Sequence, residues 1–396
     1  MTEERFEHKV VISGIGQSVI GRRLGISDMT LTVDSCLAAV ADAGLNLDQI
    51  DGLVAWPGEY PAPPGFTGPS VWRTKDALNL KLKWHHSCVE GPGQASALMT
   101  AMMAVASGIC RHALVYRTLA EATGQGGGGR SGASPVDAGG VTGVFQWLRP
   151  FGSVTAAVWL APYFQRYIHD YGIQREQVAW LPVTQRANAL KHGTALLPVP
   201  LSVEDYMESR IIASPFCLFD CDIPADGSTA FVVSAAEYGP DSPNPVRVDA
   251  IGSELSDTRP LWDQPVESTA MAARDAGRHL WSRTDLTPED VDVVEVYDGF
   301  SFLALVWLES MGFAKPGEAV SLFEGGQHAS IGGTLPINTA GGQLSQGRLH
   351  GFGLVHEACR QLRGQAGAGQ VEGAEVAAVG VGGGPLGGCL LLTASR

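Results

Sequence analysis

The sequence predicts an α/β protein built from two similar halves with an insertion between them. The main observation is a repeated order of elements: a strand ending in glycine, a helix with apolar residues at helical spacing, a linker and a second strand. This order occurs at residues 9–15, 30–44 and 47–56, and again at 246–252, 269–283 and 286–295. The two blocks are offset by about 240 residues, which is typical of an internal duplication.

A glycine turn, a helix and a strand extend the match between the halves. They lie at residues 91–106 and 112–116 in the first half, and at 341–362 and 376–381 in the second. The order of four elements therefore agrees. Two such halves packed as one unit predict a layered arrangement of helices and sheet.

The segment between the halves predicts a cap over the core. We expect a first half over residues 1–123, a loop and cap insertion over 124–212, and a return to the core with the second half over 213–396. The glycine-rich loop at 124–130 is not followed by Gly-Lys-Ser/Thr, so it does not predict a phosphate site. Helices are expected at 154–171 and 174–192, and Asp226–Gly227 is expected as a turn before a strand at 231–233.

Composition limits the classes of function. The chain has 396 residues, of which 45% are hydrophobic and 17% charged, so it is long and apolar enough for one large or two similar well-buried domains. The formal net charge of −14, without a Lys/Arg cluster, argues against a nucleic-acid partner. It also leaves no obvious basic surface for phosphates.

Cysteine usage and hydropathy predict a cytoplasmic protein. The seven cysteines are scattered, and their odd number is typical of reduced thiols. Cys217 and Cys221 have no second Cys or His pair, so no metal site is expected. The charged N-terminus lacks the apolar core of a signal peptide, and no run of 18 apolar residues predicts insertion into a membrane.

The stretch 293–302 (VVEVYDGFSF) predicts the functional site. It begins as a buried strand, continues through the Asp-Gly turn signal, and ends at the start of an apolar helix. Tyr297 and Asp298 therefore lie at the C-terminal end of a strand. In α/β proteins ligands bind at that edge of the sheet.

The glycine-rich stretch 379–390 predicts a turn between two strands. One interpretation is a tight hairpin whose turn needs positive φ, and the other is a backbone platform close to a ligand; both concern Gly382, Gly383 and Gly384. The two interpretations are compatible.

Together these pieces resemble the thiolase superfamily, in its sterol-carrier-protein or lipid-transfer-protein branch. The resemblance is carried by residues 215–221 (PFCLFDC) with Asp226–Gly227, by 296–301 (VYDGFS), by Asn338 with 341–347 (GGQLSQG), and by Gly382–Gly384. It covers nearly the whole chain. It implies a thiolase-like fold with two duplicated halves in an α/β/α/β/α arrangement, carrying a cap insertion.

At most catalytic positions the chain departs from the thiolases. Cys88 stands three residues before Gly91, as a nucleophile would, but if Gly93 is the matching glycine, Glu90 takes that place. The branch's His-Asp-Cys-Phe is Tyr297-Asp298-Gly299-Phe300 here, and Gly-His-Pro is Gly347-Arg348-Leu349, with His350 next. The second catalytic cysteine falls on Gly380. Without these groups Claisen chemistry by the usual route is not expected.

The substitutions are similar to those of the steroid side-chain-cleaving retro-aldolases, the lipid-transfer-protein aldolases. This resemblance implies cleavage of a β-hydroxyacyl-CoA steroid side chain to a ketosteroid and propionyl-CoA, without a covalent cysteine nucleophile. Tyr297 is then the candidate acid/base group and His350 the next. Asp298 either orients Tyr297 or caps the following helix, with the cap favoured. Cys88 and Gly382–Gly384 would lie against the substrate, with backbone amides near Gly383 as an oxyanion site.

The same resemblance implies partners. A DUF35-type protein with a zinc ribbon and an OB fold would bind a homodimeric core to form an α2β2 assembly, and zinc would be confined to that partner. The first-half strand after the nucleophile turn is expected at the dimer interface. No cofactor beyond the CoA thioester substrate is implied. The subgroup has a second functional tyrosine near position 352, where this chain has Phe352.

The sequence is also compatible with two other functions. One is a degenerate thiolase or acyltransferase that uses Cys88 as its nucleophile. The other is a non-catalytic carrier of acyl-CoA or sterol, or a scaffold for a partner.

Overall fold

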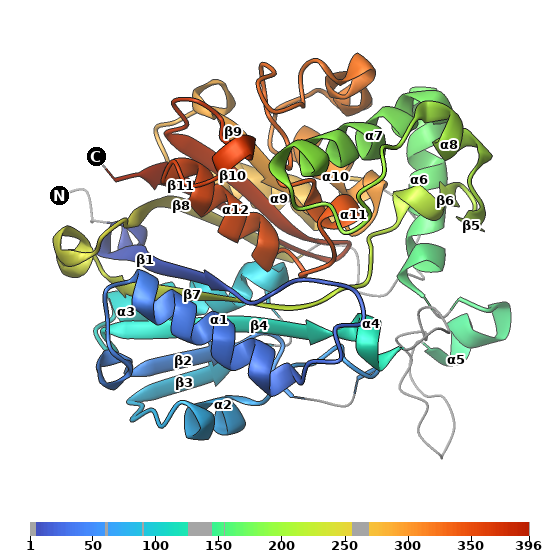
Figure 1. Cartoon of the computed structure of the whole chain (residues 1–396). Coiled ribbons are helices and arrows are strands. Elements are labelled where there is room, and N and C mark those ends of the chain that lie inside the picture. The colour runs from blue at the N-terminus through green and yellow to red at the C-terminus, as the bar shows by residue number, and fades with distance from the viewer. Residues whose placement is uncertain are drawn as a thin grey trace.

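The computed structural model describes residues 5–59, 62–88, 91–125, 145–153, 155–255 and 269–395. Over these residues, nine strands form one mixed sheet in the order β3-β2-β4-β7-β1-β8-β11-β10-β9 (Figure 1). The first half contributes β1 Val10–Gln17, β2 Gly52–Ala55, β3 Trp84–Ser87, β4 His112–Ala120 and β7 Asp226–Ala235. The second half contributes β8 Val246–Leu255, β9 Val293–Val296, β10 Val376–Gly383 and β11 Leu386–Ala394.

Both halves use the same strand directions. β2 and β4 are parallel, and β4, β7 and β1 are successively antiparallel. In the same way β9 and β10 are parallel, and β10, β11 and β8 are successively antiparallel. The halves join where β1 pairs with β8, through Val11–Arg247 and Ile12–Val246. This correspondence confirms the predicted duplication.

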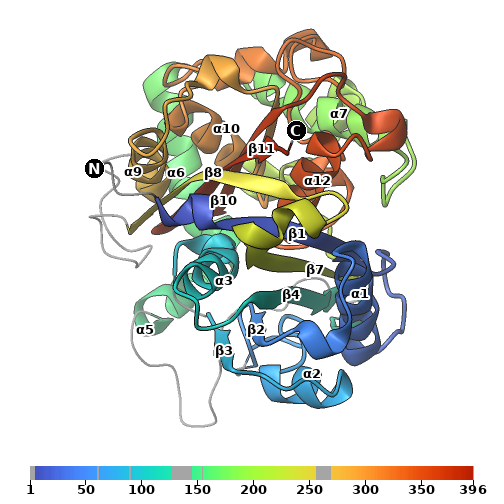
Figure 2. The same cartoon turned by 90° about the vertical axis from the view of Figure 1, so that its left-hand side faces the viewer.

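The helices complete the layers. α1 (Asp28–Asp42) packs on β1 and β7, and α9 (Met271–Trp281) packs on β8 and β11. α12 (Phe352–Leu362) packs on β9 and β10 but also contacts β1 and β7, while the turn η3 (Gly93–Ala95) before α3 (Ser96–Ala106) contacts β10 and β11. α3 and α12 therefore lie between the half-sheets, with α1 and α9 on the outer faces (Figure 2). The expected α/β/α/β/α arrangement is confirmed.

The cap contains the two predicted helices, α6 (Ala156–Tyr171) and α7 (Arg175–His192). Both end at a glycine in the left-handed region, Gly172 with φ +67° and Gly193 with φ +83°. α7 packs on α10 (Ser301–Ser310) and on the short helix α11 (Gly342–Ser345), so the cap rests on the second half. The cap also holds α5 Phe145–Leu148, α8 Val203–Glu208, β5 Ile211–Ala213 and β6 Phe216–Cys217. Most of the glycine-rich loop predicted at 124–130 lies outside the described residues.

One local prediction is wrong. Asp226–Gly227 is not a turn, because β7 begins at Asp226. The buried Asp226 carboxylate accepts hydrogen bonds from the Leu24 and Thr123 backbone N–H groups at 2.8 and 3.0 Å, which fixes both segments beside the strand. The strand after the nucleophile turn, β4, lies between β2 and β7, and β3 is the edge strand of this half. Which surface meets a second copy stays a prediction.

Within the described ranges, none of the helices combines the length and the apolar composition of a membrane-spanning segment. Nor do His, Cys, Asp and Glu side chains in those ranges form a group of three or more that could hold a metal ion.

Candidate active site

The end of β9 is held from both sides, which fixes the position of Tyr297. The Tyr297 N–H donates to the Gly380 carbonyl of β10 at 2.8 Å. On the other side, the buried Asn338 side chain accepts from the Val296 N–H at 2.8 Å and donates to the Val296 carbonyl at 3.0 Å. Tyr297 itself is 9% exposed. The predicted strand-end tyrosine is therefore rigidly placed and nearly buried.

Gly299 makes room for the Tyr297 ring, and Gly351 borders that ring. A Cβ atom at Gly299 would lie 2.6 Å from Tyr297 Cε1 and 3.0 Å from its hydroxyl oxygen. On the other side of the ring, a Cβ atom at Gly351 would lie 3.7 Å from Tyr297 Cδ2. The tyrosine and Gly299 are thus a coupled pair: a side chain at 299 cannot coexist with the tyrosine ring in this position.

Asp298 is a capping residue, but not for the helix that was expected. Its carboxylate accepts the backbone N–H groups of Gln343 at 2.8 Å and Leu344 at 3.2 Å, so it caps α11. α10, which follows Asp298 in the chain, has no side-chain cap. Burial raises the pKa of the Asp298 carboxyl to about 6, although these hydrogen bonds oppose the rise.

His350 lies in a strained and buried position next to Tyr297. Its φ is +49°, in the region that favours glycine, and it is 4% exposed. Its Nδ1 lies 2.8 Å from Nη2 of Arg117, a buried residue of β4. The imidazole also contacts the rings of Trp56 and Phe66 edge-on, with centroids 5.6 and 5.0 Å away. Gly351, which follows His350 in the chain, borders the tyrosine ring, so the backbone next to His350 lies near Tyr297. That the two side chains act in one site stays a prediction.

Arg348 occupies the place of the histidine in Gly-His-Pro and serves as an ion-pairing residue. Its Nη2 lies 2.5 Å from the Glu121 carboxylate, and its Nε lies 3.7 Å from that of Asp222. An arginine remains protonated in proteins, so it does not exchange a proton here. The pair instead ties the loop before α12 to the end of β4.

Cys88 does not join this group through any contact that the described residues show. Its N–H donates to the Ala55 carbonyl at 3.2 Å, and its thiol lies 3.6 Å from the hydroxyl of Thr100 on α3. Burial raises the pKa of the Cys88 thiol, which disfavours the thiolate that a nucleophile needs. Glu90, the other residue considered for this place, lies outside the described residues.

The glycines of the C-terminal hairpin are explained by close packing. A Cβ atom at Gly380, where thiolases have their second cysteine, would lie 2.7 Å from the Trp307 ring. A Cβ atom at Gly383 would lie 2.8 Å from a methyl group of Leu303. The hairpin interpretation is confirmed, while a platform for an oxyanion stays a prediction.

The turn of the C-terminal hairpin, between β10 and β11, packs against the first half of the molecule. Gly382 has φ +94° and Gly384 has φ +73°, as the tight turn requires. A Cβ atom at Gly382 would lie 3.1 Å from Cα of Gly93, whose φ is +57°. Thus Gly93 of the nucleophile turn, rather than Cys88, abuts the predicted substrate-binding glycines.

Phe352 has no polar role. It is 1% exposed, and its ring lies against Phe231 of β7 with centroids 5.7 Å apart. The side chain therefore anchors the start of α12 in the core. Further along α12, the Glu357 carboxylate lies 3.1 Å from Nε2 of His192 and accepts a hydrogen bond from the Thr339 hydroxyl at 2.9 Å, so it connects α12 to the cap.

Arg117 and its aromatic neighbours were not predicted from the sequence. Arg117 directly follows the strand predicted at 112–116, so the rule that selected Tyr297 also applies to it. Trp56 and Phe66 lie beside a Pro/Gly-rich loop, where periodicity gives no signal. Their grouping depends on contacts between segments that are far apart in the sequence.

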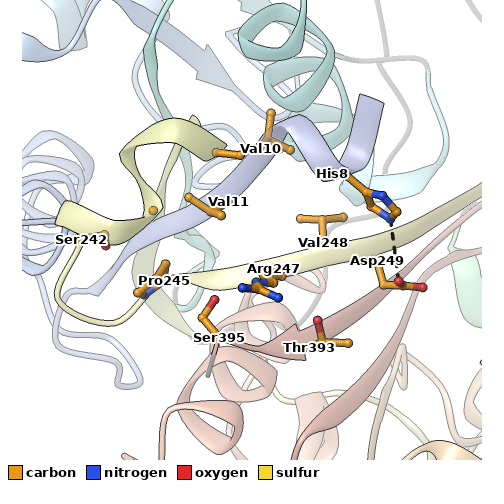
Figure 3. A pocket seen from close by; sticks show the side chains of 12 residues that line it. His8, Val10, Val11, Ser242, Pro245, Arg247, Val248, Asp249, Thr393 and Ser395 are labelled. Atoms are coloured by element: carbon orange, nitrogen blue, oxygen red, sulfur yellow. Dashed lines mark ion pairs between the residues drawn. The ribbon is translucent and has the colours of Figure 1, made fainter. Parts of the chain in front are cut away.

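A separate cavity lies towards the other end of the strands, and Figure 3 shows the side chains that line it. It has a volume of about 840 Å³ and is lined by the starts of β1 and β8 and the end of β11, including Arg247, Asp249 and Thr393. Thr393 pairs with Val376 at the start of β10, whereas Gly383 and Tyr297 lie at the other end of that strand. The cavity is therefore not part of the candidate active site.

The chain is similar in sequence to a known family and to two characterised relatives. Residues 254–389 match the family described as thiolase C-terminal domain-like. The chain is 33% identical to the steroid side-chain-cleaving aldolase of Thermomonospora curvata over 359 residues, which cover 89% of this chain and 90% of that protein. It is 32% identical to the 17-hydroxy-3-oxo-4-pregnene-20-carboxyl-CoA lyase of Mycobacterium tuberculosis over 364 residues, covering 90% and 92% of the two chains.

A solved structure agrees with the sequence comparisons. The Ltp2-ChsH2(DUF35) aldolase superposes with a TM-score of 0.87 at 31% identity, over 98% of each chain. The human mitochondrial 3-ketoacyl-CoA thiolase shares the fold with a TM-score of 0.68 at 12% identity. Both structures share the thiolase-like fold with this chain. Only the first also shows clear sequence similarity, at 31% identity over 98% of each chain.

Proposed function

This chain belongs to the thiolase superfamily, within its group of steroid side-chain-cleaving aldolases, and on that premise we propose that it cleaves a β-hydroxyacyl-CoA steroid side chain by a retro-aldol reaction. The proposed substrate is a steroid with a tertiary 17-hydroxyl group and a 20-carboxyl-CoA side chain, the class named for the mycobacterial relative. The proposed products are a ketosteroid and propionyl-CoA.

The reaction balances without a covalent intermediate. A base takes the proton of the β-hydroxyl, and the carbon that carries this oxygen becomes the ketone. The bond between the α and β carbons breaks, and its electron pair forms the enolate of the thioester. The α carbon then takes a proton to give propionyl-CoA. The site must therefore supply a base, a stabilised oxyanion and an acid.

One observation carries the proposal: the Tyr297 ring lies against Gly299, with Gly351, the neighbour of His350 in the chain, at its other edge. By the resemblance to the thiolases, these positions correspond to those of their acid/base groups. Tyr297 is the proposed proton-transfer group and His350 its partner at the thioester. Asp298 positions α11 rather than exchanging protons, since both its oxygens accept backbone N–H groups. The proposed thioester contacts are the Gly382–Gly384 turn and, at the edge, Cys88.

We propose that the chain acts with a partner. The related solved assembly contains a DUF35 protein, and a DUF35-type subunit with a zinc ribbon and an OB fold would form an α2β2 complex with a homodimer of this chain. The net charge of −14 favours leaving the CoA phosphates to that partner. We propose no cofactor for this chain beyond the CoA thioester substrate. That substrate and the seven free cysteines of the chain favour a cytoplasmic location.

The test is an assay of the assembled protein. The chain is co-expressed with a DUF35-type partner and incubated with a 17-hydroxy steroid 20-carboxyl-CoA, and propionyl-CoA and ketosteroid are measured by mass spectrometry. We expect Tyr297→Phe to lower kcat by about 10²-fold or more, because it removes the proton-transfer group. Tyr171→Phe, the same substitution at a side chain that is 43% exposed, is the matched control and should retain activity. Cys88→Ala tests the covalent alternative and should keep most of kcat, because Cys88 only borders the thioester in this proposal. Unchanged cleavage by Tyr297→Phe, or loss in Cys88→Ala alone, would contradict the proposal.

A further inference from the structure

The contact between Arg117 and His350 links the two halves of the molecule inside the site. Arg117 is 1% exposed and comes from β4, while His350 is 233 residues further along the chain. The distance from Nη2 of Arg117 to Nδ1 of His350 is 2.8 Å. A second donor of the guanidinium reaches the Thr118 carbonyl at 3.2 Å. Burial and these two bonds fix the direction of the guanidinium.

This contact determines which nitrogen of His350 carries the proton. An arginine side chain has five N–H donors and no acceptor, and it stays charged. A hydrogen bond between it and an imidazole nitrogen therefore requires that Nδ1 accept. The proton of the neutral imidazole must then reside on Nε2. A second proton on Nδ1 would place two donors, both on cations, 2.8 Å apart.

The surroundings hold both side chains in this arrangement. The Arg117 guanidinium carbon lies 4.9 Å from the centroid of the Trp56 ring and 5.1 Å from that of Phe66, as in cation–π contacts. The same two rings meet the His350 imidazole edge-on. His350 keeps a backbone φ of +49°, a strained conformation for a residue other than glycine, which persists where the surroundings enforce it.

We propose that Arg117 is a positioning residue that fixes His350 as the neutral Nε2–H tautomer. His350 then acts as a hydrogen-bond donor to the thioester oxygen as the enolate forms, and Tyr297 accepts the hydroxyl proton. A neutral imidazole that polarises a carbonyl oxygen is an established catalytic device in other enzymes. This division of labour rests on the proposed retro-aldolase function. It also explains how the site works with Phe352 where a second tyrosine was expected.

The alternative role for His350, a general base, needs the opposite tautomer. A base at Nε2 must be unprotonated there, so its proton would be on Nδ1 and would face the N–H of Arg117. In that arrangement two N–H donors would face each other across 2.8 Å. The two roles therefore differ in a property that can be measured directly.

The first test is ¹⁵N NMR of the full-length chain labelled at its ten histidines. His350→Gln identifies the His350 signals by their loss. We expect an unprotonated Nδ1 and a protonated Nε2 at neutral pH, with the Nδ1 signal changed in Arg117→Met. A proton on Nδ1, or a doubly protonated ring, would overturn the proposal. This readout needs no substrate, so it stands apart from failure of the retro-aldolase assignment.

The second test compares side chains in the cleavage assay. The amide nitrogen of Gln can replace Nε2–H as a donor, so His350→Gln should stay within about 10-fold of wild-type kcat, whereas His350→Ala should lose about 10²-fold or more. Equal losses in both variants, or none in His350→Ala, would contradict the donor role.

The role of Arg117 is tested with two substitutions, one that removes the positive charge and one that keeps it. Arg117→Met should lower kcat with little change in KM, because it acts on the transition state through His350. Arg117→Lys keeps a charged donor and should recover part of that loss. Wild-type kcat in Arg117→Met would refute the positioning role. If Arg117→Met does not fold, the wild-type NMR spectrum and the two His350 variants still decide the matter.

Discussion

At the scale of single residues, the site depends on substitutions that must occur together because their side chains would otherwise clash. Tyr297 and Gly299 stand where the branch has histidine and cysteine, and the structure shows why they occur together. The tyrosine position was predictable, because a strand end and an Asp-Gly turn are local signals. The coupling was not, since it depends on where the ring lies. The same holds for Asp298, whose partners at Gln343 and Leu344 are more than 40 residues away.

We expect Gly299→Ala to displace the tyrosine ring. Its Cβ would lie 2.6 Å from Tyr297 Cε1, so the free energy of unfolding should fall by about 1–3 kcal/mol, and cleavage should be lost with the ring position. Urea denaturation and the cleavage assay measure the two effects. Gly239→Ala is a matched control, because its Cβ would only touch Val11 Cγ1 at 3.7 Å. Wild-type stability and activity in Gly299→Ala would show that the ring has room elsewhere.

At the scale of elements, the long periodic segments were predicted and the irregular ones were not. Apolar spacing located α1 closely, and the two helices expected in the cap at 154–171 and 174–192 are α6 and α7. The segment 341–362 is instead divided into α11 and α12, because Gly347, His350 and Gly351 all have positive φ. Left-handed residues end a helix, and a histidine in that region carries no sequence signal. The break matters, since it carries Arg348 and His350 into the site.

The cap is attached to α10 by a buried polar contact. The Tyr167 hydroxyl of α6 donates to the Glu309 carboxylate, which also accepts the Gly317 N–H at 2.9 Å. Burial raises the pKa of Glu309 to about 7. Tyr167→Phe removes a donor from this buried carboxyl, so we expect a loss of about 1–3 kcal/mol in the free energy of unfolding and faster hydrogen exchange in α6.

The control for the cap is a second tyrosine in the same helix. Tyr171→Phe makes the same substitution at a side chain that is 43% exposed, and it should change stability by less than about 0.5 kcal/mol. Equal effects of the two variants on α6 exchange would mean that the Glu309 contact does not hold the cap.

At the scale of the whole molecule, the duplication organises the sheet and leaves its two edges different. The order of elements was enough to predict two halves, because each half repeats the same local patterns. The joining of β1 to β8 was not predictable, since it is a short pairing between strands about 230 residues apart. At one edge β3 is an exposed strand, while in the second half a single bridge, Val294–Ile337, takes its place.

An exposed edge strand is a template for pairing with another copy, and β3 is the first-half edge of the described sheet. If the homodimer of the proposed assembly forms there, His85 and His86 of two copies would approach each other across the symmetry axis. The double change His85→Glu and His86→Glu places like charges at that contact. We expect it to shift the chain from a dimer towards the 41.7 kDa monomer in light scattering after size exclusion. Ile109→Glu, an exposed apolar residue beyond α3, is the control and should leave the dimer intact. A dimer that resists the double change would place the interface on another surface.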